Sequence, residues 1–230
     1  ILVFENPSNI SIVPIAHGYR INHSRTHRIH RLYLGGFHID NEEIETDMPR
    51  IPELRTDQMS SQQLRVHDEI LAGPRGSLQG PFHAWLHSPG LADPAQKLGE
   101  FCRFSSALPK RLSELAILVI ARHWCAQFEW YAHSPMAISA GISATVVEAI
   151  RTNEKPILGA DDERLVYEFV SELLETRTVS QSTYNQAEAM LGRLAVVDLV
   201  GIVGYYCLVS ITLNVFDMPL PKGEAPPLSR

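Results

Sequence analysis

Apolar residues in the chain from residue 52 to about residue 215 recur at helical spacing. In RLSELAILVIARHW, the residues Leu112, Leu115, Leu118 and Ala121 follow the three- and four-residue intervals that place side chains on one helical face. No run alternates apolar and polar residues for long enough to predict a core strand. The pattern therefore predicts an all-α protein.

Capping residues and breakers divide this region into separate helices. Thr56 or Asp57 is predicted to begin a helix that reaches about residue 72 and stops at GPRG, which we interpret as a structural turn. Further helices are expected after Gly80–Phe82, from Asp93-Pro94, after Leu108-Pro109, after Gly141–Ser143, from Asp161-Asp162, after Ser180 and over residues 194–215.

The last of these helices contains the most apolar run of the chain, Leu199 to Leu213, which lies between Asp198 and Asn214. A bilayer requires about 20 consecutive apolar residues, and this run is shorter. We therefore expect a helix buried in the core or in a subunit interface, and no membrane partner.

Residues 1–48 differ in composition from the rest of the chain. They hold five of the ten histidines, and up to His38 their only acid is Glu5, against four arginines. His23, His27 and His30 are spaced as metal ligands often are, but no Cys or acid lies near them and the intervening arginines would repel a cation. A basic extension that contacts a partner or serves in targeting is the preferred interpretation. The expected organisation is an N-terminal extension (1–48), a helical domain (49–222) and a proline-rich surface tail (223–230).

Composition narrows the choice of partners and compartment. The formal charge of −6 and the pI near 5.9 argue against nucleic acid or an anionic membrane as the main partner. Cys102, Cys125 and Cys207 are odd in number and far apart, which is typical of free thiols in a reducing compartment. A cytoplasmic location is expected, and targeting to an organelle by the N-terminal segment stays open.

The segment HWCAQFEWYAH, residues 123–133, holds the main candidate chemistry. Glu129 and His133 are four residues apart and therefore lie on one helical face. Such a pair is an acid/base unit, half of a metal site, or an exposed contact worth only a few tenths of a kcal/mol. The chain contains no nucleophile elbow, phosphate-binding loop, dinucleotide fingerprint or HExxH motif that would favour another chemistry.

The longer stretch ELAILVIARHWCAQFEWYAHSPMAISAGIS resembles the signature of the carboxymuconolactone decarboxylase family, which shares a helical fold with alkylhydroperoxidase D. Glu114, Glu129, His133 and Gly141-Ile-Ser follow one another in the order of that signature. The resemblance covers most of residues 50–222. It implies an all-α, alkylhydroperoxidase D-like fold and a homo-oligomer, such as a trimer or hexamer.

The cysteines depart from one branch of this fold. Alkylhydroperoxidase D-type members use a Cys-x-x-Cys pair seven and four residues before the histidine, where this chain has Ala126 and Glu129. Cys125 is one residue out of register, which turns it about 100° around a helix. Dithiol peroxidase chemistry needs a reactive thiolate and a resolving partner, so the sequence argues against it. Cys125 is interpreted as a packing residue.

With glutamate at residue 129, the resemblance implies the decarboxylase branch. His133 would be the general acid/base, Glu129 its partner and Glu114 a second carboxylate in the pocket. The implied reaction removes CO2 from a small carboxylated lactone or β-keto acid and requires no metal or organic cofactor. In one straight helix Glu114 and His133 would be about 28 Å apart, so they meet only if the chain reverses near residues 123–126 or if a second subunit supplies one of them.

Four further residues are candidates for substrate binding: Arg122 as a carboxylate clamp, and Trp130, His83 and His87 as pocket residues. Taken alone, the sequence favours core or pocket-wall packing for Trp130 and structural roles for His83 and His87, and an ordinary salt bridge is an alternative for Arg122. Two other functions also stay open, a peroxidase that uses Cys125 alone and a non-catalytic oligomer that binds a small acid.

Overall fold

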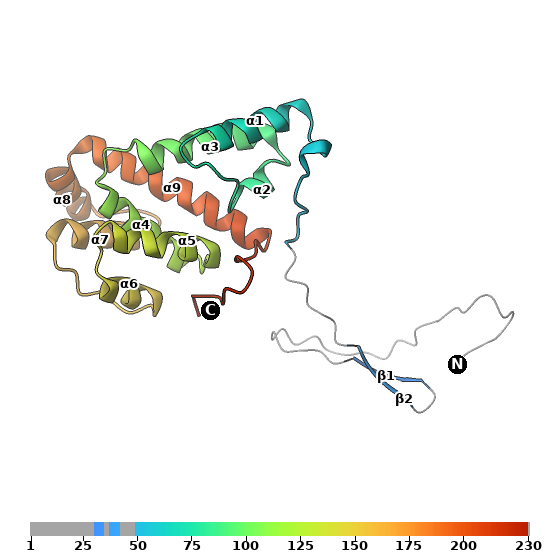
Figure 1. The fold of residues 1–230 in the computed structure, drawn as a ribbon. Coiled ribbons are helices and arrows are strands. Elements are labelled where there is room, and N and C mark those ends of the chain that lie inside the picture. Colours follow the sequence, from blue (N-terminus) through green and yellow to red (C-terminus); the bar gives the residue numbers. More distant parts are fainter. Residues whose placement is uncertain (1–29, 35–36, 42–48, 230) are drawn as a thin grey trace, which may run out of the picture. The chain divides into compact units, whose positions relative to one another are not determined.

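The computed structural model describes residues 30–34, 37–41 and 49–229. The chain divides into two compact units, residues 1–46 and 47–230 (Figure 1).

In the first unit, strands β1 (His30–Leu34) and β2 (Phe37–Asn41) form an antiparallel pair, with His30 opposite Asn41 and Leu34 opposite Phe37. The helical spacing of the main body did not predict this pair. A Gly-Gly step between the two short runs is a hairpin signal in the sequence. His23 and His27, two of the three histidines considered as metal ligands, lie outside the described residues.

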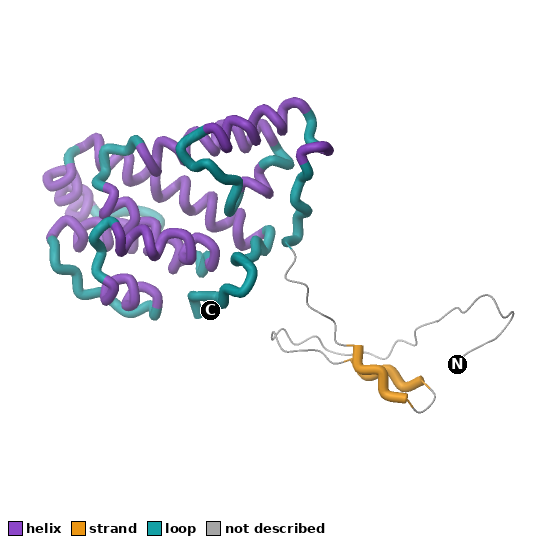
Figure 2. The backbone as a smooth tube through the Cα atoms, in the orientation of Figure 1, coloured by secondary structure: helices purple, strands orange, loops and turns teal. Residues whose placement is uncertain are grey.

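In the second unit, all the regular secondary structure of the described residues is helical (Figure 2). Its elements, in chain order, are the 3-10 helix η1 (Thr56–Gln58), α1 (Ser61–Ala72), α2 (Phe82–Trp85), α3 (Pro89–Phe104), α4 (Lys110–His123), α5 (Gln127–Ser139), α6 (Ala144–Arg151), α7 (Asp161–Thr176), α8 (Gln181–Leu191) and α9 (Arg193–Val215).

Local signals placed most helix starts correctly. Ser143 and Ser180 cap α6 and α8, because their side chains accept hydrogen bonds from the backbone N–H groups three residues on. The predicted start of α1 at Thr56 or Asp57 is wrong, since those residues form η1 and α1 begins after Ser60. There, Ser60 and Gln63 satisfy each other's backbone N–H groups in a capping box.

The predicted start of α3 at Asp93 is also wrong. The helix begins four residues earlier, at Pro89, where a proline loses nothing because the first N–H groups of a helix have no partner. Pro94 consequently lies inside α3.

Helices α4 and α9 form the centre of the helical unit. Residues 112–121 of α4 are all buried, and this helix packs against α5, α7 and α9. With its 23 residues, α9 is long and apolar enough to cross a membrane, but 56% of its most apolar window is buried inside the helical unit. It also packs against α3, α5 and α8, so α9 occupies the place of a core helix, as its sequence predicts.

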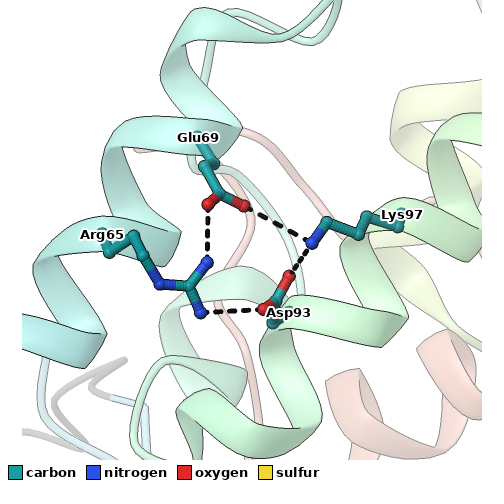
Figure 3. Close-up of polar contacts among 4 residues, drawn as sticks. All are labelled: Arg65, Glu69, Asp93 and Lys97. Carbon is teal, nitrogen blue, oxygen red and sulfur yellow. Dashed lines mark hydrogen bonds and ion pairs between the residues drawn. The ribbon is translucent and has the colours of Figure 1, made fainter.

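At the surface, α1 and α3 are joined by a cluster of four charged side chains, which we call the exposed cluster: Arg65, Glu69, Asp93 and Lys97 (Figure 3). Arg65 bonds Glu69 at 2.6 Å and Asp93 at 2.8 Å, and Lys97 also contacts both carboxylates. Positive and negative groups therefore alternate around a ring of contacts that ties the two helices together.

Candidate functional site

A sharp reversal of the chain between α4 and α5 builds the site. Helix α4 ends at His123, Cys125 adopts a left-handed conformation with φ 50°, and α5 begins at Gln127. The N–H of Ala126 donates to the carbonyl of Ala121 at 2.8 Å, which closes the turn. Because α4 and α5 then run side by side, Glu114 and His133 meet within one chain.

Three side chains, which we call the buried triad, meet between these helices: Glu114 from α4, and Glu129 and His133 from α5. The Nδ1 of His133 lies 2.7 Å from Oε2 of Glu114, and its Nε2 lies 3.0 Å from Oε1 of Glu129. The imidazole is thus held through both ring nitrogens. The three residues are between 2% and 5% exposed, so water does not screen these contacts.

This environment keeps His133 protonated at neutral pH. Burial alone lowers the pKa of His133, but the charges of Glu129 and Glu114 and their hydrogen bonds outweigh it and raise the pKa to about 9. The imidazolium then donates its Nδ1–H to Glu114 and forms an ion pair with Glu129 through Nε2. The ammonium of Lys110 lies 3.7 Å from the other oxygen of Glu114 and adds a weaker, more exposed contact.

Glu129 and His133 line a cavity of about 140 Å³. Its remaining wall combines apolar and aromatic side chains with a few polar ones, including Arg75, Phe82, Arg103, Phe128, Met136 and Tyr206. Glu114 does not line this cavity, because it bonds the opposite ring nitrogen of His133. Its expected position as a second carboxylate in the pocket is therefore wrong, and it lies behind the imidazole instead.

Two tyrosines of α9 complete the surroundings of the histidine. The ring of Tyr206 packs edge-on against the imidazole of His133, with centroids 5.2 Å apart, and Tyr205 packs against Tyr206 in the same way. Burial raises the pKa of Tyr205 to about 12 and that of Tyr206 well above its usual range, so both hydroxyls are neutral. No signal in the sequence indicated the role of these two tyrosines, because they lie within the most apolar run of the chain.

The four substrate-binding candidates lie away from this cavity. Trp130 is 2% exposed and belongs to the core. His83 faces Glu53 at 3.6 Å, and exposed His87 contacts the carbonyl of Pro52 at 2.8 Å. Arg122 donates to the carbonyl of Ser229 at 2.9 Å and lines a different, larger hollow of about 660 Å³ between α4 and α7 that holds none of the buried triad.

The C-terminal tail is anchored at the start of α5. The side-chain amide of Gln127 donates to the carbonyl of Leu228 and accepts from its N–H, both at 2.9 Å, and the Leu228 side chain is buried. Arg151 holds the neighbouring carbonyl of Pro227 at 3.0 Å. The tail therefore follows the surface as predicted up to Ser229, which is exposed, but the side chain of Leu228 is buried against the helical unit.

The cysteines lie outside the cavity, and all three are free thiols. Cys125 sits in the α4–α5 turn, with its sulfur 3.7 Å from the carbonyl of Ser229. Burial raises the pKa of Cys102 to about 11 and also raises that of Cys207, which disfavours the reactive thiolate in both.

Comparison with solved structures identifies the architecture. A crystal structure from Ralstonia eutropha JMP134, described as an alkylhydroperoxidase AhpD core and an uncharacterized peroxidase-related protein, superimposes with a TM-score of 0.62. The match covers 76% of this chain and 93% of that one, at 12% sequence identity. The chain has the AhpD-like fold. This confirms the predicted fold class.

At that identity the AhpD-like fold alone is shared, and the likeness does not separate a decarboxylase from a peroxidase. No protein-family model and no curated protein matches the sequence. Function is therefore argued from the site itself.

Proposed function

We propose that the helical unit is a cofactor-independent acid/base enzyme that removes CO2 from a small carboxylated lactone or β-keto acid. One observation carries the proposal: a buried, protonated His133 is held between two carboxylates, and both His133 and Glu129 line a small cavity. A proton donor held in a fixed position at the wall of a small cavity is what this reaction requires.

The step is balanced without a further reactant. The bond between the carboxylate carbon and the substrate breaks, CO2 leaves, and the bonding electrons remain on the substrate as an enolate. The positive charge of His133 stabilises this developing negative charge. The enolate carbon then takes a proton from the His133–Glu129 pair, and solvent restores that proton after the product leaves.

Glu114 is assigned a positioning role. By accepting from Nδ1 it fixes the ring orientation of His133 and raises its basicity, as a carboxylate behind a catalytic histidine commonly does. Glu129, which faces the cavity, is the carboxylate expected to touch substrate.

The alternative is a peroxidase that uses Cys125 alone, and the description of the Ralstonia protein as peroxidase-related keeps it open. Cys125 does not line the cavity, and Glu129 stands at the position of the second cysteine of the dithiol pair. Cys125→Ser separates the two functions. It should leave CO2 release unchanged, whereas peroxide consumption that disappears with the thiol would favour the peroxidase.

The test is CO2 release from a panel of carboxylated lactones and β-keto acids by the wild type, His133→Gln and His67→Gln. His67 is a matched control, because it is a partly buried histidine of α1 outside the cavity. Loss of general acid/base catalysis typically costs about 10²- to 10⁴-fold in rate, so that loss is expected for His133→Gln only. Release by none of the panel, or release unchanged in His133→Gln, would contradict the proposal.

A further inference from the structure

Two arginines stand out in the wall of the cavity that holds His133 and Glu129. Arg75 comes from the turn after α1, and Arg103 from the last turn of α3. Both side chains are half-buried. The cavity therefore brings two positive groups to the same small space as the proposed catalytic pair.

Neither guanidinium is neutralised within the described part of the chain. The Nε and one terminal nitrogen of Arg75, and the Nε of Arg103, are buried and have no hydrogen-bond partner there. By contrast, Arg111, which is also half-buried, pairs with both Asp162 and Glu163. Buried guanidinium nitrogens without a counter-ion are costly. Two arginines with such nitrogens in one cavity therefore indicate an anionic ligand.

The contacts that both arginines do make hold them in place without neutralising them. The guanidinium of Arg75 lies over the ring of Phe82 at 5.0 Å. That of Arg103 lies over Phe104 at 5.3 Å and donates to the sulfur of Met136 at 3.3 Å. Aromatic faces and a thioether attract a cation weakly and leave its remaining N–H groups available for a ligand.

Gly99 of α3 makes the position of Arg75 possible. A side chain at residue 99 would collide with the terminal nitrogen of Arg75 and with the hydroxyl of Tyr205. Glycine therefore gives both groups room to reach the cavity wall across α3.

The charges around the cavity favour an anion. With His133 protonated, the buried triad carries one net negative charge, because two carboxylates face one imidazolium. Arg75 and Arg103 contribute two positive charges, and Lys110 adds a third beside Glu114, so positive charge exceeds negative charge around the cavity. The tyrosine hydroxyls are neutral and do not change this balance.

We propose that Arg75 and Arg103 together bind a carboxylate of the substrate beside the His133–Glu129 pair. This inference rests on the proposed function and specifies its substrate. Two cations stabilise a carboxylate relative to neutral CO2, so the carboxylate that they hold is one that the substrate keeps.

The volume of the cavity limits the part of a ligand that it encloses. Engineered cavities of about 150 Å³ hold benzene, and this one has a volume of about 140 Å³. The ligand portion that enters is consequently a single five- or six-membered ring or an acyclic chain of similar size.

The test is binding of 2-furoate, a five-membered ring with one carboxylate, and of its uncharged amide, 2-furamide, measured by calorimetry. The wild type is expected to bind the acid and not the amide. Arg75→Gln and Arg103→Gln should each weaken furoate binding by about ten- to a hundredfold, the usual loss of a hydrogen bond to a charged group. Arg151→Gln, a half-buried arginine outside the cavity, is the matched control.

Arg75→Lys and Arg103→Lys keep the charge and the fold, and should retain part of the affinity if the glutamine variants fail to fold. Binding that is equal for acid and amide, or that is unchanged in both folded glutamine variants, would overturn the inference. His133→Gln separates it from the proposed function. If that variant loses turnover but keeps furoate affinity, both stand; if furoate binding needs the arginines while no substrate is turned over, only the anion site stands.

Discussion

The exposed cluster and the buried triad are built from the same materials, and they behave differently because of burial. Each alternates acids and bases at short range, with contacts from 2.5 to 3.7 Å in the former and of 2.7 and 3.0 Å in the latter. Side chains of the exposed cluster are 21–59% accessible, whereas those of the buried triad are 2–6% accessible.

The chemical outcome follows from that difference. In the exposed cluster, hydrogen bonds from Lys97 and Arg65 lower the pKa of Asp93, and Asp93 raises the pKa of both cations. The pKa of each of these groups moves further from pH 7, and each group stays charged. In the buried triad the pKa of His133 moves upward through neutrality to about 9, so its protonation state changes. Screening by water thus explains why the exposed cluster forms ordinary surface ion pairs, whereas His133 in the buried triad is prepared for proton transfer.

The largest expected effect comes from removing the histidine from the buried triad. His133→Asn leaves Glu114 and Glu129 without the imidazolium between them, and only the half-exposed Lys110 still contacts Glu114. Breaking a buried ion pair typically costs about 3–5 kcal/mol, and the free energy of unfolding at neutral pH should fall by that amount in urea titrations. The control is the triple variant that combines His133→Asn with Glu114→Gln and Glu129→Gln. It removes the unpaired charges and should recover part of the lost stability. A single variant as stable as the wild type would contradict this account.

A second, somewhat smaller effect is expected from pH alone. The pKa of His133 rises from 6.5 to about 9 on folding, and each unit is worth about 1.4 kcal/mol, which gives about 3 kcal/mol of stability. Because the folded pKa is the higher one, this stability is fully present below the unfolded pKa and is lost as pH rises through the folded pKa. Urea unfolding of wild type from about pH 6 to about pH 10 should show the loss. In His133→Asn the same range should give a flatter profile, and equal slopes would count against the assignment.

The smallest effect is expected in the exposed cluster. Lys97→Met removes both contacts of the ammonium with Asp93 and Glu69, but these groups keep their hydration and Arg65. Exposed ion pairs contribute little and are screened by salt, so the urea midpoint should shift slightly at low salt and not at high salt. A loss comparable with that of His133→Asn would remove the distinction between the two clusters.

The sequence predicted those parts of the site that depend on one helix. Glu129 and His133 lie next to each other because an α-helix such as α5 has 3.6 residues per turn. Their four-residue spacing in the sequence is enough to predict this. Glu114 was conditional on a reversal of the chain, which the turn at residues 124–126 supplies. The position of the Glu114 side chain behind the imidazole, away from the cavity, depends on how α4 and α5 pack. The spacing of residues in the sequence does not predict that position.

The arginines could not be predicted in the same way. Arg75 lies in a turn interpreted as structural, and Arg103 lies at the end of a helix whose start was misplaced. Arg75 has room at the cavity because Gly99 carries no side chain beside Tyr205, and Arg103 lies on α3, which packs against α9. Contacts of this kind join segments far apart in the sequence and leave no local pattern. Similarly, residue type alone indicates Arg122, Trp130, His83 and His87 as pocket residues, and packing directs them elsewhere.

The anchored tail has a consequence for how this chain is able to vary. Leu228 is held by Gln127, the first residue of the helix that carries Glu129 and His133. A proline-rich segment of this kind would ordinarily vary freely in evolution, whereas here its leucine is tied to the helix that bears the proposed catalytic pair. Natural variants and redesigned versions alike are expected to change Gln127 and residues 227–229 as one inherited unit.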